Sequence, residues 1–162
     1  MDDSTVLLSL GSNLGDRKAN IHSALRKLGD SGVNLVSISS FYETEPVGDL
    51  DQPEFMNIVC AANTSIPPFK LLDLCQEIEK ISGREKKGDS SPRCLDIDIL
   101  LYGNRIIYSP RLTLPHPRMY RRNFVLIPLR EIQPEFVNPV TGLGIDQLIK
   151  ESGDKSWVKV SG

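Results

Sequence analysis

One stretch organises the chain: Pro92-Arg93-Cys94-Leu95-Asp96-Ile97-Asp98-Ile99-Leu100-Leu101-Tyr102-Gly103. From Leu95 to Tyr102 the residues are mostly apolar and Gly103 follows them, so the pattern predicts a short buried strand. Two acidic residues, Asp96 and Asp98, interrupt it. Side chains two residues apart on a strand lie on the same face, about 6.5–7 Å apart. The two carboxylates therefore need a partner, because burying like charges together is unfavourable.

Two kinds of positively charged partner can compensate the negative charge of the paired aspartates. Arg93 stands three residues before Asp96 and can form an ion pair with it at the end of the strand. A divalent cation is the alternative, since Mg²⁺ binds one or two carboxylates and completes its shell with water and phosphate oxygens. The aspartates alone do not decide between a structural ion pair and a metal site.

Length and composition indicate a single globular domain over residues 1–162. Hydrophobic residues make up 40% and charged residues 25%, which are ordinary values for a globular chain. The net charge of −2 argues against general binding to nucleic acid or to a membrane surface. Between Arg84 and Arg130, however, ten Lys and Arg residues accompany four Asp and Glu residues. The resulting local charge of +6 suits a small polyanion.

The cysteines indicate a reducing compartment. Cys60, Cys75 and Cys94 are odd in number and form no C-x-x-C pair, which disfavours a disulfide framework or a zinc site. The acidic start lacks the apolar segment of a signal peptide, and no apolar run approaches the roughly 20 residues of a membrane span. We therefore expect a cytoplasmic protein that binds no membrane.

Periodicity and turn residues predict alternating strands and helices, with Asp16 as the cap of the first helix. The predicted strands cover 5–10, 33–42, 55–64 and 95–102, with another beginning at Phe124 and a last one over 157–160. The predicted helices cover 16–28, 69–81 and 145–149, and the loops 43–53, 84–92 and 104–122. This order predicts an α+β fold with a ferredoxin-like βαββαβ core, an antiparallel sheet, flanking helices and a C-terminal extension.

Basic side chains on the loops beside the aspartate strand indicate phosphate binding. Guanidinium forks suit phosphate oxygens, and they are supplied here by Arg84, Arg93, Arg111 and Arg122. His116, between two prolines, can donate to a phosphate or transfer a proton. Each of these residues alone has an ordinary solvated or structural interpretation. Together with the acids they indicate phosphoryl transfer, although the chain has no G-x-x-x-x-G-K-[ST] loop.

A second group of residues indicates a site for a flat heterocycle. Phe55 and Asn57 reach the same face of their strand, and Phe124 begins a strand that can lie nearby. An aromatic pair can sandwich a ring while an amide reads its edge. Core packing is the ordinary interpretation of the phenylalanines. A buried Asn57, however, needs hydrogen-bond partners, which the backbone of Thr44–Gly48 can supply.

Five segments follow one another with the spacing of a known family. They read Leu8-Ser9-Leu10-Gly11-Ser12-Asn13-Leu14-Gly15, Phe41-Tyr42-Glu43-Thr44-Glu45-Pro46-Val47-Gly48, Asp51-Gln52-Pro53-Glu54-Phe55-Met56-Asn57, Arg93-Cys94-Leu95-Asp96-Ile97-Asp98 and Leu114-Pro115-His116-Pro117. Through these segments the sequence resembles the hydroxymethyldihydropterin pyrophosphokinases of folate biosynthesis, from about Val6 to Pro134.

The resemblance implies an ATP-dependent enzyme. It would transfer pyrophosphate from ATP to the hydroxymethyl group of 6-hydroxymethyl-7,8-dihydropterin and release AMP. The resemblance further implies two Mg²⁺ ions at Asp96 and Asp98, and catalytic roles for Arg84 and Arg93 on a loop that closes over the reactants. As partners we expect these two small substrates and no nucleic acid, and we expect a monomer or a weak homodimer.

The resemblance also implies a site for each substrate. The pterin would stack between Phe55 and Phe124, and Asn57 and the backbone at Thr44 and Val47 would read its edge. The ATP contacts would be Gln76, Glu79, Arg84, Arg93, Ile99, Arg111, Thr113, His116 and Arg122.

Three departures from the family pattern concern loop closure and the pterin. Ser90-Ser91 stand where many members have Trp-Gly. Phe55 replaces a frequent Tyr, and Pro117 stands where some members have Tyr. The metal and phosphate residues are unchanged.

Two other functions fit part of the pattern. An RRM-like RNA-binding module shares the βαββαβ order, but it needs exposed aromatics on its central strands, which this sequence does not offer. A nucleotidyltransferase would use the D-x-D pair to transfer a nucleoside monophosphate, and its leaving product would be pyrophosphate and not AMP.

Overall fold

The structure is a computed structural model that describes residues 3–46, 51–83 and 93–161. In chain order its elements are β1 (Thr5–Ser12), α1 (Arg17–Asp30), β2 (Val33–Ile38), β3 (Tyr42–Thr44), β4 (Phe55–Thr64), α2 (Pro68–Ile81), β5 (Asp96–Tyr102), β6 (Ile107–Tyr108), β7 (Thr113–Leu114), the 3₁₀ helix η1 (Met119–Arg121), α3 (Asn123–Ile132), α4 (Ile145–Glu151) and β8 (Val158–Val160). None of the helices in this part of the chain has the length and apolarity that a bilayer span requires.

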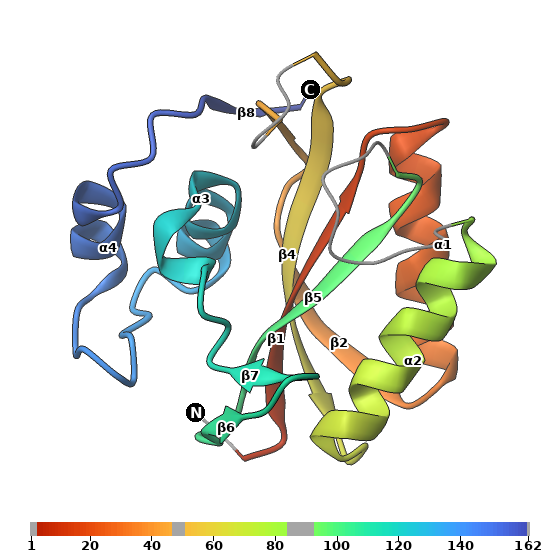
Figure 1. Cartoon of the computed structure of the whole chain (residues 1–162), viewed down its shortest axis with the longest axis horizontal. Coiled ribbons are helices and arrows are strands. Elements are labelled where there is room, and N and C mark those ends of the chain that lie inside the picture. The colour runs from red at the N-terminus through yellow and green to blue at the C-terminus, as the bar shows by residue number, and fades with distance from the viewer. Residues whose placement is uncertain (1–2, 47–50, 84–92, 162) are drawn as a thin grey trace.

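The main sheet has six antiparallel strands, and it runs through the centre of the molecule (Figure 1). Its strands follow the order β5-β1-β4-β3-β8, and β2 pairs with β4 as well. β1 and β4 are buried along nearly their whole length, because both of their faces are covered. A separate two-stranded ribbon of β6 and β7 lies beside one end of the sheet.

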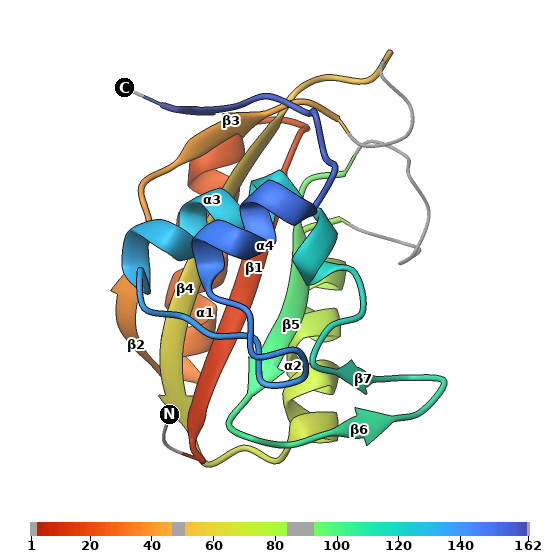
Figure 2. The same ribbon diagram turned by 90° about the vertical axis from the view of Figure 1, so that its left-hand side faces the viewer.

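Helices cover both faces of the sheet, with α1 and α2 on one side and α3, backed by α4, on the other (Figures 1 and 2). Alternate residues of the central strands supply the two cores, as the period of two requires. Leu8 and Ile58 face the core beneath α1 and α2. Leu7 and Val59 face the core beneath α3 and α4.

The aspartate strand follows the same alternation. Leu95, Ile97 and Ile99 are buried in the core beneath α1 and α2. Asp96 and Asp98, which alternate with them, are half-buried and lie on the opposite face of β5. The prediction that the two carboxylates share one face is confirmed.

Several predicted elements are present with small changes in their bounds. The carboxylate of Asp16 caps α1 by accepting a hydrogen bond from the backbone N–H of Ala19 (3.1 Å). β4 has the predicted bounds, and α2, α4 and β8 lie where a helix or strand was predicted. The predicted irregular segment 104–122 contains the short elements β6, β7 and η1.

The predicted strand over 33–42 is wrong as a single element. It is divided into β2 and β3, which pair with different parts of β4. Between them, Ser39 donates its backbone N–H to Val59 O (2.9 Å) and accepts the Val59 N–H on its hydroxyl (3.0 Å). The predicted loop over 43–53 therefore begins too early, because Tyr42–Thr44 forms β3.

The predicted strand from Phe124 is also wrong, because this segment forms the helix α3. Val125, Leu126 and Leu129 are buried on one side of it, at the three- and four-residue spacing of a helix. A six-residue apolar run does not reveal that period, and Pro128 within it argues locally against a helix. Phe124 consequently lies in the first turn of a helix that packs on β4.

Candidate active site

The register of the sheet brings the paired aspartates next to the predicted ring-reading amide. Asp96 on β5 pairs with Gly11 on β1, and Gly11 pairs on its other side with Asn57 on β4. Adjacent strands lie about 4.8 Å apart, so Asp96 and Asn57 are about 10 Å apart across the sheet. Asp98 pairs with Ser9 in the next row of the same face. The predicted acidic site and the predicted ring-binding site are therefore next to each other, with Gly11 between them.

Gly11 allows this arrangement because it has no side chain. A Cβ atom at this position would lie 2.4 Å from Oδ1 of Asn57 and 3.6 Å from Cδ1 of Phe55. The first distance is far inside van der Waals contact, so the carboxamide of Asn57 lies directly against the Gly11 backbone. Any other residue at position 11 would displace it.

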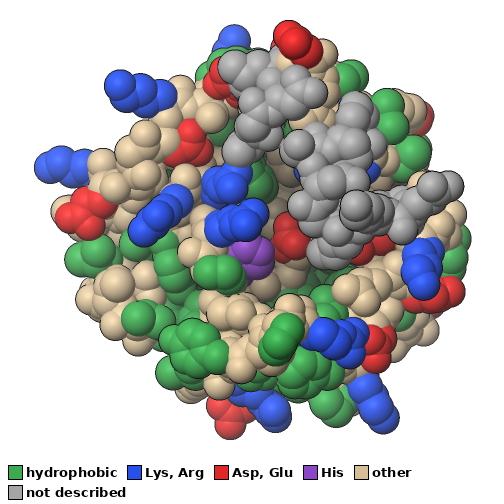
Figure 3. All heavy atoms as spheres, viewed as in Figure 1, with side chains coloured by type: hydrophobic (Ala, Val, Ile, Leu, Met, Phe, Trp, Pro, Cys, Tyr) green, Lys and Arg blue, Asp and Glu red, His purple; other side chains and the backbone are tan. Residues whose placement is uncertain are grey.

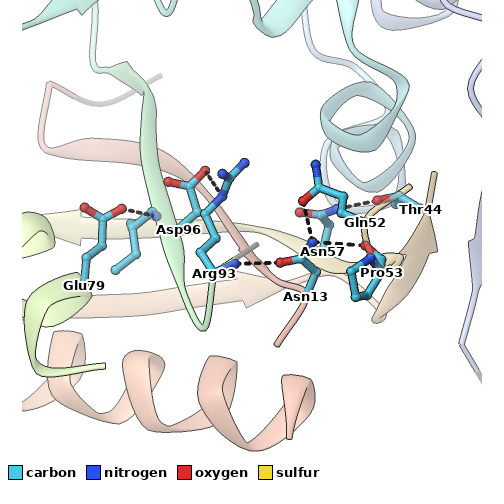
Figure 4. A network of polar contacts seen from close by, with 9 residues as sticks. Asn13, Thr44, Gln52, Pro53, Asn57, Glu79, Arg93 and Asp96 are labelled. Carbon is cyan, nitrogen blue, oxygen red and sulfur yellow. Dashed lines mark hydrogen bonds and ion pairs between the residues drawn. The ribbon is translucent and has the colours of Figure 1, made fainter. Parts of the chain in front are cut away.

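The amide of Asn57 is held in a fixed orientation. Its Nδ2 donates a hydrogen bond of 2.6 Å to Oγ1 of Thr44 on the neighbouring strand β3 (Figure 4). Asn57 is 5% exposed and Thr44 only 1%, so water does not compete for this bond. The predicted neighbourhood of Asn57 and Thr44 is thus present, although the bond joins side chains and not the Thr44 backbone.

Arg93 connects Asp96 with Phe55, the aromatic residue of the predicted ring site. Its Nε lies 3.9 Å from Oδ2 of Asp96, and its guanidinium carbon lies 5.1 Å from the centre of the Phe55 ring. The guanidinium therefore covers one face of that ring. A flat ligand can stack on this face of Phe55 once the Arg93 side chain has moved away.

Asn13 ties together three segments that border the site, and the sequence did not single it out. Its Nδ2 donates to Oε1 of Gln52 (2.8 Å) and to the carbonyl of Pro53 (3.0 Å), and its Oδ1 accepts the backbone N–H of Arg93 (2.8 Å) (Figure 4). Asn13 is buried, so these bonds form in a low dielectric. The available sequence signal was a polar amide directly after a buried strand, which we interpreted as a turn.

Glu79, a predicted nucleotide contact, is almost fully buried on α2. Its Oε2 accepts the backbone N–H of Ile97 (2.8 Å), the residue between the two aspartates (Figure 4). The N–H groups of an outer strand need partners once they are buried. Glu79 therefore fixes the backbone that carries Asp96 and Asp98, and its contact with a nucleotide stays a prediction.

His116 lies along the outer edge of β5. Its backbone N–H donates to the carbonyl of Leu100 (2.8 Å), and its Nδ1 accepts the backbone N–H of Arg118 (3.1 Å). With Nδ1 used as an acceptor, the neutral ring carries its proton on Nε2. Nε2 is therefore a donor, as contact with a phosphate oxygen requires.

Arg122 interacts electrostatically with both acidic and basic side chains. Burial lowers the pKa of its guanidinium, and the nearby charge of Arg118 lowers it further, whereas Asp154 and Asp98 act in the opposite direction. Arg122 is thus close enough to Asp98 to interact with it. Figure 3 shows basic, acidic and histidine side chains gathered near the middle of the face that Figure 1 presents.

The remaining predicted residues are more dispersed. Arg111 is exposed and pairs with Asp73 of α2 (Nη2–Oδ1 2.5 Å). The side chain of Ile99 is buried in the core, so its contact with a nucleotide would have to come from the backbone. Gln76 on α2, Thr113 on β7 and Phe124 in α3 are half-buried. Val47 and Arg84 lie outside the described residues.

The donor set of the aspartate strand fits a hard divalent cation. Asp96 and Asp98 offer carboxylate oxygens on one half-buried face. Within residues 3–46, 51–83 and 93–161, no group of three or more His, Cys, Asp or Glu side chains could enclose a metal ion. Two carboxylates suit Mg²⁺, which keeps water and phosphate oxygens as its other ligands, better than zinc, which takes three or four protein ligands.

Two relatives with known names match most of this chain. The chain is 42% identical over 158 residues to the 2-amino-4-hydroxy-6-hydroxymethyldihydropteridine pyrophosphokinase of Haemophilus influenzae, and the match covers 97% of this chain and 98% of that protein. It is 47% identical over 145 residues to the folic acid synthesis protein fol1 of Pneumocystis carinii, covering 90% of this chain but only 20% of that longer protein.

A solved structure supports the fold of this chain, and a family model identifies its family. The wild-type HPPK-DHPS of Plasmodium falciparum superposes with a TM-score of 0.72 at 16% identity, covering 91% of this chain and 44% of that one, which supports the fold alone. The family model for 7,8-dihydro-6-hydroxymethylpterin-pyrophosphokinase matches residues 7–134. The chain therefore belongs to the 7,8-dihydro-6-hydroxymethylpterin-pyrophosphokinase family.

Proposed function

We propose that the face of the sheet around Asp96, Asp98 and Asn57 is the active site of this pyrophosphokinase. As a family member, the chain is an ATP-dependent pyrophosphokinase of folate biosynthesis. The reaction transfers pyrophosphate from ATP to the hydroxymethyl group of 6-hydroxymethyl-7,8-dihydropterin. The observation that carries the site assignment is the row Asp96, Gly11 and Asn57, which sets an acidic centre about 10 Å from a buried amide.

The pterin would lie over the Gly11 end of this row. Asn57 would read its edge, with the amide orientation fixed by Thr44. Phe55 would stack on one face of the ring after Arg93 has moved away, and Phe124 would stack on the other. The backbone at Val47 is the remaining predicted contact.

The triphosphate would lie over Asp96 and Asp98. These carboxylates would hold two Mg²⁺ ions, which when bound neutralise the triphosphate and polarise the transferred group. Arg122 and the Nε2–H of His116 would contact phosphate oxygens, since both lie beside β5. The other proposed ATP contacts are Gln76, Glu79, Arg84, Arg93, Ile99, Arg111 and Thr113.

The chemical step is an in-line displacement at the β-phosphorus of ATP. The hydroxymethyl oxygen forms a bond to the β-phosphorus. At the same time the bond between the β-phosphorus and the oxygen that bridges it to the α-phosphate breaks. AMP leaves with that oxygen, and the hydroxyl proton passes to solvent. Arg93 and Arg84 would stabilise the charge on the transferred group. No described side chain of the site stands out as a general base, so positioning and charge neutralisation are expected to provide most of the rate.

Analysis of the products tests this proposal directly. The protein is incubated with ATP, Mg²⁺ and the dihydropterin, and the products are identified by mass spectrometry. AMP together with the pterin pyrophosphate is the expected result. Release of pyrophosphate with an adenylated pterin would overturn it in favour of the nucleotidyltransferase alternative. The RNA-binding alternative is not supported, since helices cover both faces of the sheet.

Several broader features are part of the same proposal. We infer that β1, α1, β2, β4, α2 and β5 form the predicted ferredoxin-like unit, which the strand order and the shared face of α1 and α2 support. The whole of 1–162 would then be one domain that works as a monomer or weak homodimer. The cytoplasmic location predicted from the sequence stays part of this proposal.

A further inference from the structure

Residues 154–158, which we call the C-terminal strap, connect the start of α3 with β3. Asp154 bonds to Asn123, the first residue of α3, and Val158 pairs with Thr44 in the sheet. Figure 2 shows the chain passing from α4 across to the edge of the sheet near β3. The strap thus joins two elements that carry proposed pterin contacts, Phe124 and Thr44.

At its first end the strap caps α3. Arg122, which precedes the helix, makes no capping bond with its side chain. The carboxylate of Asp154 instead accepts the Asn123 N–H (2.8 Å) on Oδ2 and the Ser156 N–H (2.8 Å) on Oδ1. In return, Nδ2 of Asn123 donates to the carbonyls of Asp154 (2.9 Å) and Ser156 (3.2 Å). One carboxylate therefore fixes both the first turn of the helix and the bend of the strap.

At its other end the strap is bonded to the residue next to Thr44. The backbone N–H of Glu45 donates to the carbonyl of Trp157 (3.2 Å), and the Trp157 N–H donates to Oε2 of Glu45 (3.1 Å). Thr44 in turn accepts the bond from Asn57. A continuous series of bonds thus runs from the first turn of α3 to the amide of the proposed pterin site.

We propose that Asp154 is a positioning residue for the pterin: through the strap it fixes Phe124, at the start of α3, relative to Thr44 and Asn57 on the sheet. This inference rests on the proposed function. Asp154 itself would not touch either substrate. Its loss would let the first turn of α3 move away from the sheet and would widen the space in which the pterin stacks.

Glu131 provides a matched comparison at the other end of the same helix. Its carboxylate accepts the Ser40 N–H (2.9 Å), the Ser40 hydroxyl (3.0 Å) and the Tyr42 hydroxyl (2.5 Å). It therefore ties the last turn of α3 to the connection between β2 and β3 and to Tyr42, the first residue of β3. It lies seven positions, or about 10 Å of helix, after Phe124.

The test compares Asp154→Ala, Asp154→Asn and Glu131→Gln with the wild-type chain. Binding of the dihydropterin is measured by calorimetry in the presence of Mg²⁺ and a non-hydrolysable ATP analogue, and binding of the analogue is measured alone. We expect Asp154→Ala to weaken pterin binding about tenfold, the equivalent of losing roughly one helix cap. Asp154→Asn, which keeps one acceptor oxygen, should lose about threefold, and Glu131→Gln less than twofold.

The single tryptophan of the chain supplies a second readout, because Trp157 lies in the strap. Its emission maximum should move to longer wavelength in Asp154→Ala and stay unchanged in Glu131→Gln. Unchanged pterin binding in both Asp154 variants, or equal losses for Asp154→Asn and Glu131→Gln, would overturn the inference while leaving the proposed function intact. Failure of the wild-type chain to bind the dihydropterin would overturn both.

Discussion

Asp96 and Asn57 stand in one row of the sheet, separated by a single glycine, yet their surroundings differ. Asn57 is 5% exposed, and its amide is bonded at 2.6 Å to a buried hydroxyl. The side chain of Asp96 is 24% exposed, and its ion pair with Arg93 is long, at 3.9 Å. We call Asn57 and Thr44 the amide half of the site, and Asp96 and Asp98 the acidic half. The amide half is therefore fixed before any ligand arrives, while the acidic half remains accessible to water and ions.

This difference matches what each half is proposed to bind. A neutral heterocycle is selected by shape and by the direction of hydrogen bonds, and both require groups that are already in place. Hydrated cations and a flexible triphosphate bring their own ligands and charge, so they require accessible carboxylates more than a rigid cavity. The contrast can be tested by changing one half at a time.

The largest effect is expected from the acidic half. Asp98→Ala should fold normally, because the side chain lies on a half-buried face, but turnover should fall about 10³-fold or more through the loss of charge stabilisation. The measurement is AMP release at saturating ATP and Mg²⁺, together with a thermal melt. Asp146→Ala removes an exposed carboxylate on α4 and serves as the control. AMP release by Asp98→Ala near the wild-type rate would refute the metal role.

The next largest effect, on dihydropterin binding, is expected at Gly11, which lies between Asp96 and Asn57. Gly11→Ala would place a methyl group 2.4 Å from Oδ1 of Asn57, which must then move. We expect dihydropterin binding to weaken roughly 30- to 100-fold and the free energy of unfolding to fall by about 1–3 kcal/mol, the usual cost of overpacking.

Gly29→Ala is the matched control for this change. Position 29 lies in α1, and apart from its chain neighbours and the backbone of its own helix no heavy atom of the described residues lies within 4 Å of a Cβ built there. The same substitution should therefore stabilise the protein by about 0.5–1 kcal/mol, the helix propensity difference between glycine and alanine. Titration of the dihydropterin and urea denaturation separate the two variants. If Gly11→Ala binds the pterin as Gly29→Ala does, the amide is not part of the site.

The acidic half of the site was easier to predict from sequence than the amide half. Asp96 and Asp98 interrupt a short apolar strand, and local alternation alone predicts which face they share. The position of Asn57 beside Gly11 depends instead on pairing between β1 and β4, which are more than 40 residues apart in sequence. Without the resemblance to a family, the chain offers no local signal for that register.

The elements that were mispredicted depend on distant contacts. α3 contains Pro128 and is short, so its local sequence resembles a strand, and its cap is supplied by Asp154, 31 residues further on. Tertiary packing therefore outweighs the local preference there. The tail after Pro134 lacked any strong pattern, although it supplies that cap and the strand β8.

A smaller effect is expected from removing the amide alone. Asn57→Ala deletes the group proposed to read the pterin edge without adding any atoms, so dihydropterin binding should weaken about 10- to 30-fold. Binding of the ATP analogue should change less than twofold, because the acidic half is unaltered. Calorimetry with each ligand gives both numbers. Equal losses for the two ligands would show that Asn57 supports the whole site and does not read the pterin.

The smallest effect is expected for the pH dependence of stability that Asp154 contributes. The carboxylate of Asp154 is held by hydrogen bonds, whereas those of Asp96 and Asp98 on β5 are accessible. Burial acts to raise the pKa of Asp154, but hydrogen bonds from Asn123 and Ser156 and the charge of Arg122 outweigh it, so its pKa lies below the usual range. A carboxyl whose pKa is lower in the folded state stabilises the protein above its unfolded pKa of about 3.9, and this contribution is lost as the pH falls through the folded pKa. The difference in unfolding free energy between wild type and Asp154→Asn should therefore be largest at neutral pH and shrink below about pH 4. Urea denaturation at pH 7, 5 and 3 measures it. A difference that stays constant over this range would mean that the charge of Asp154 does not stabilise the strap.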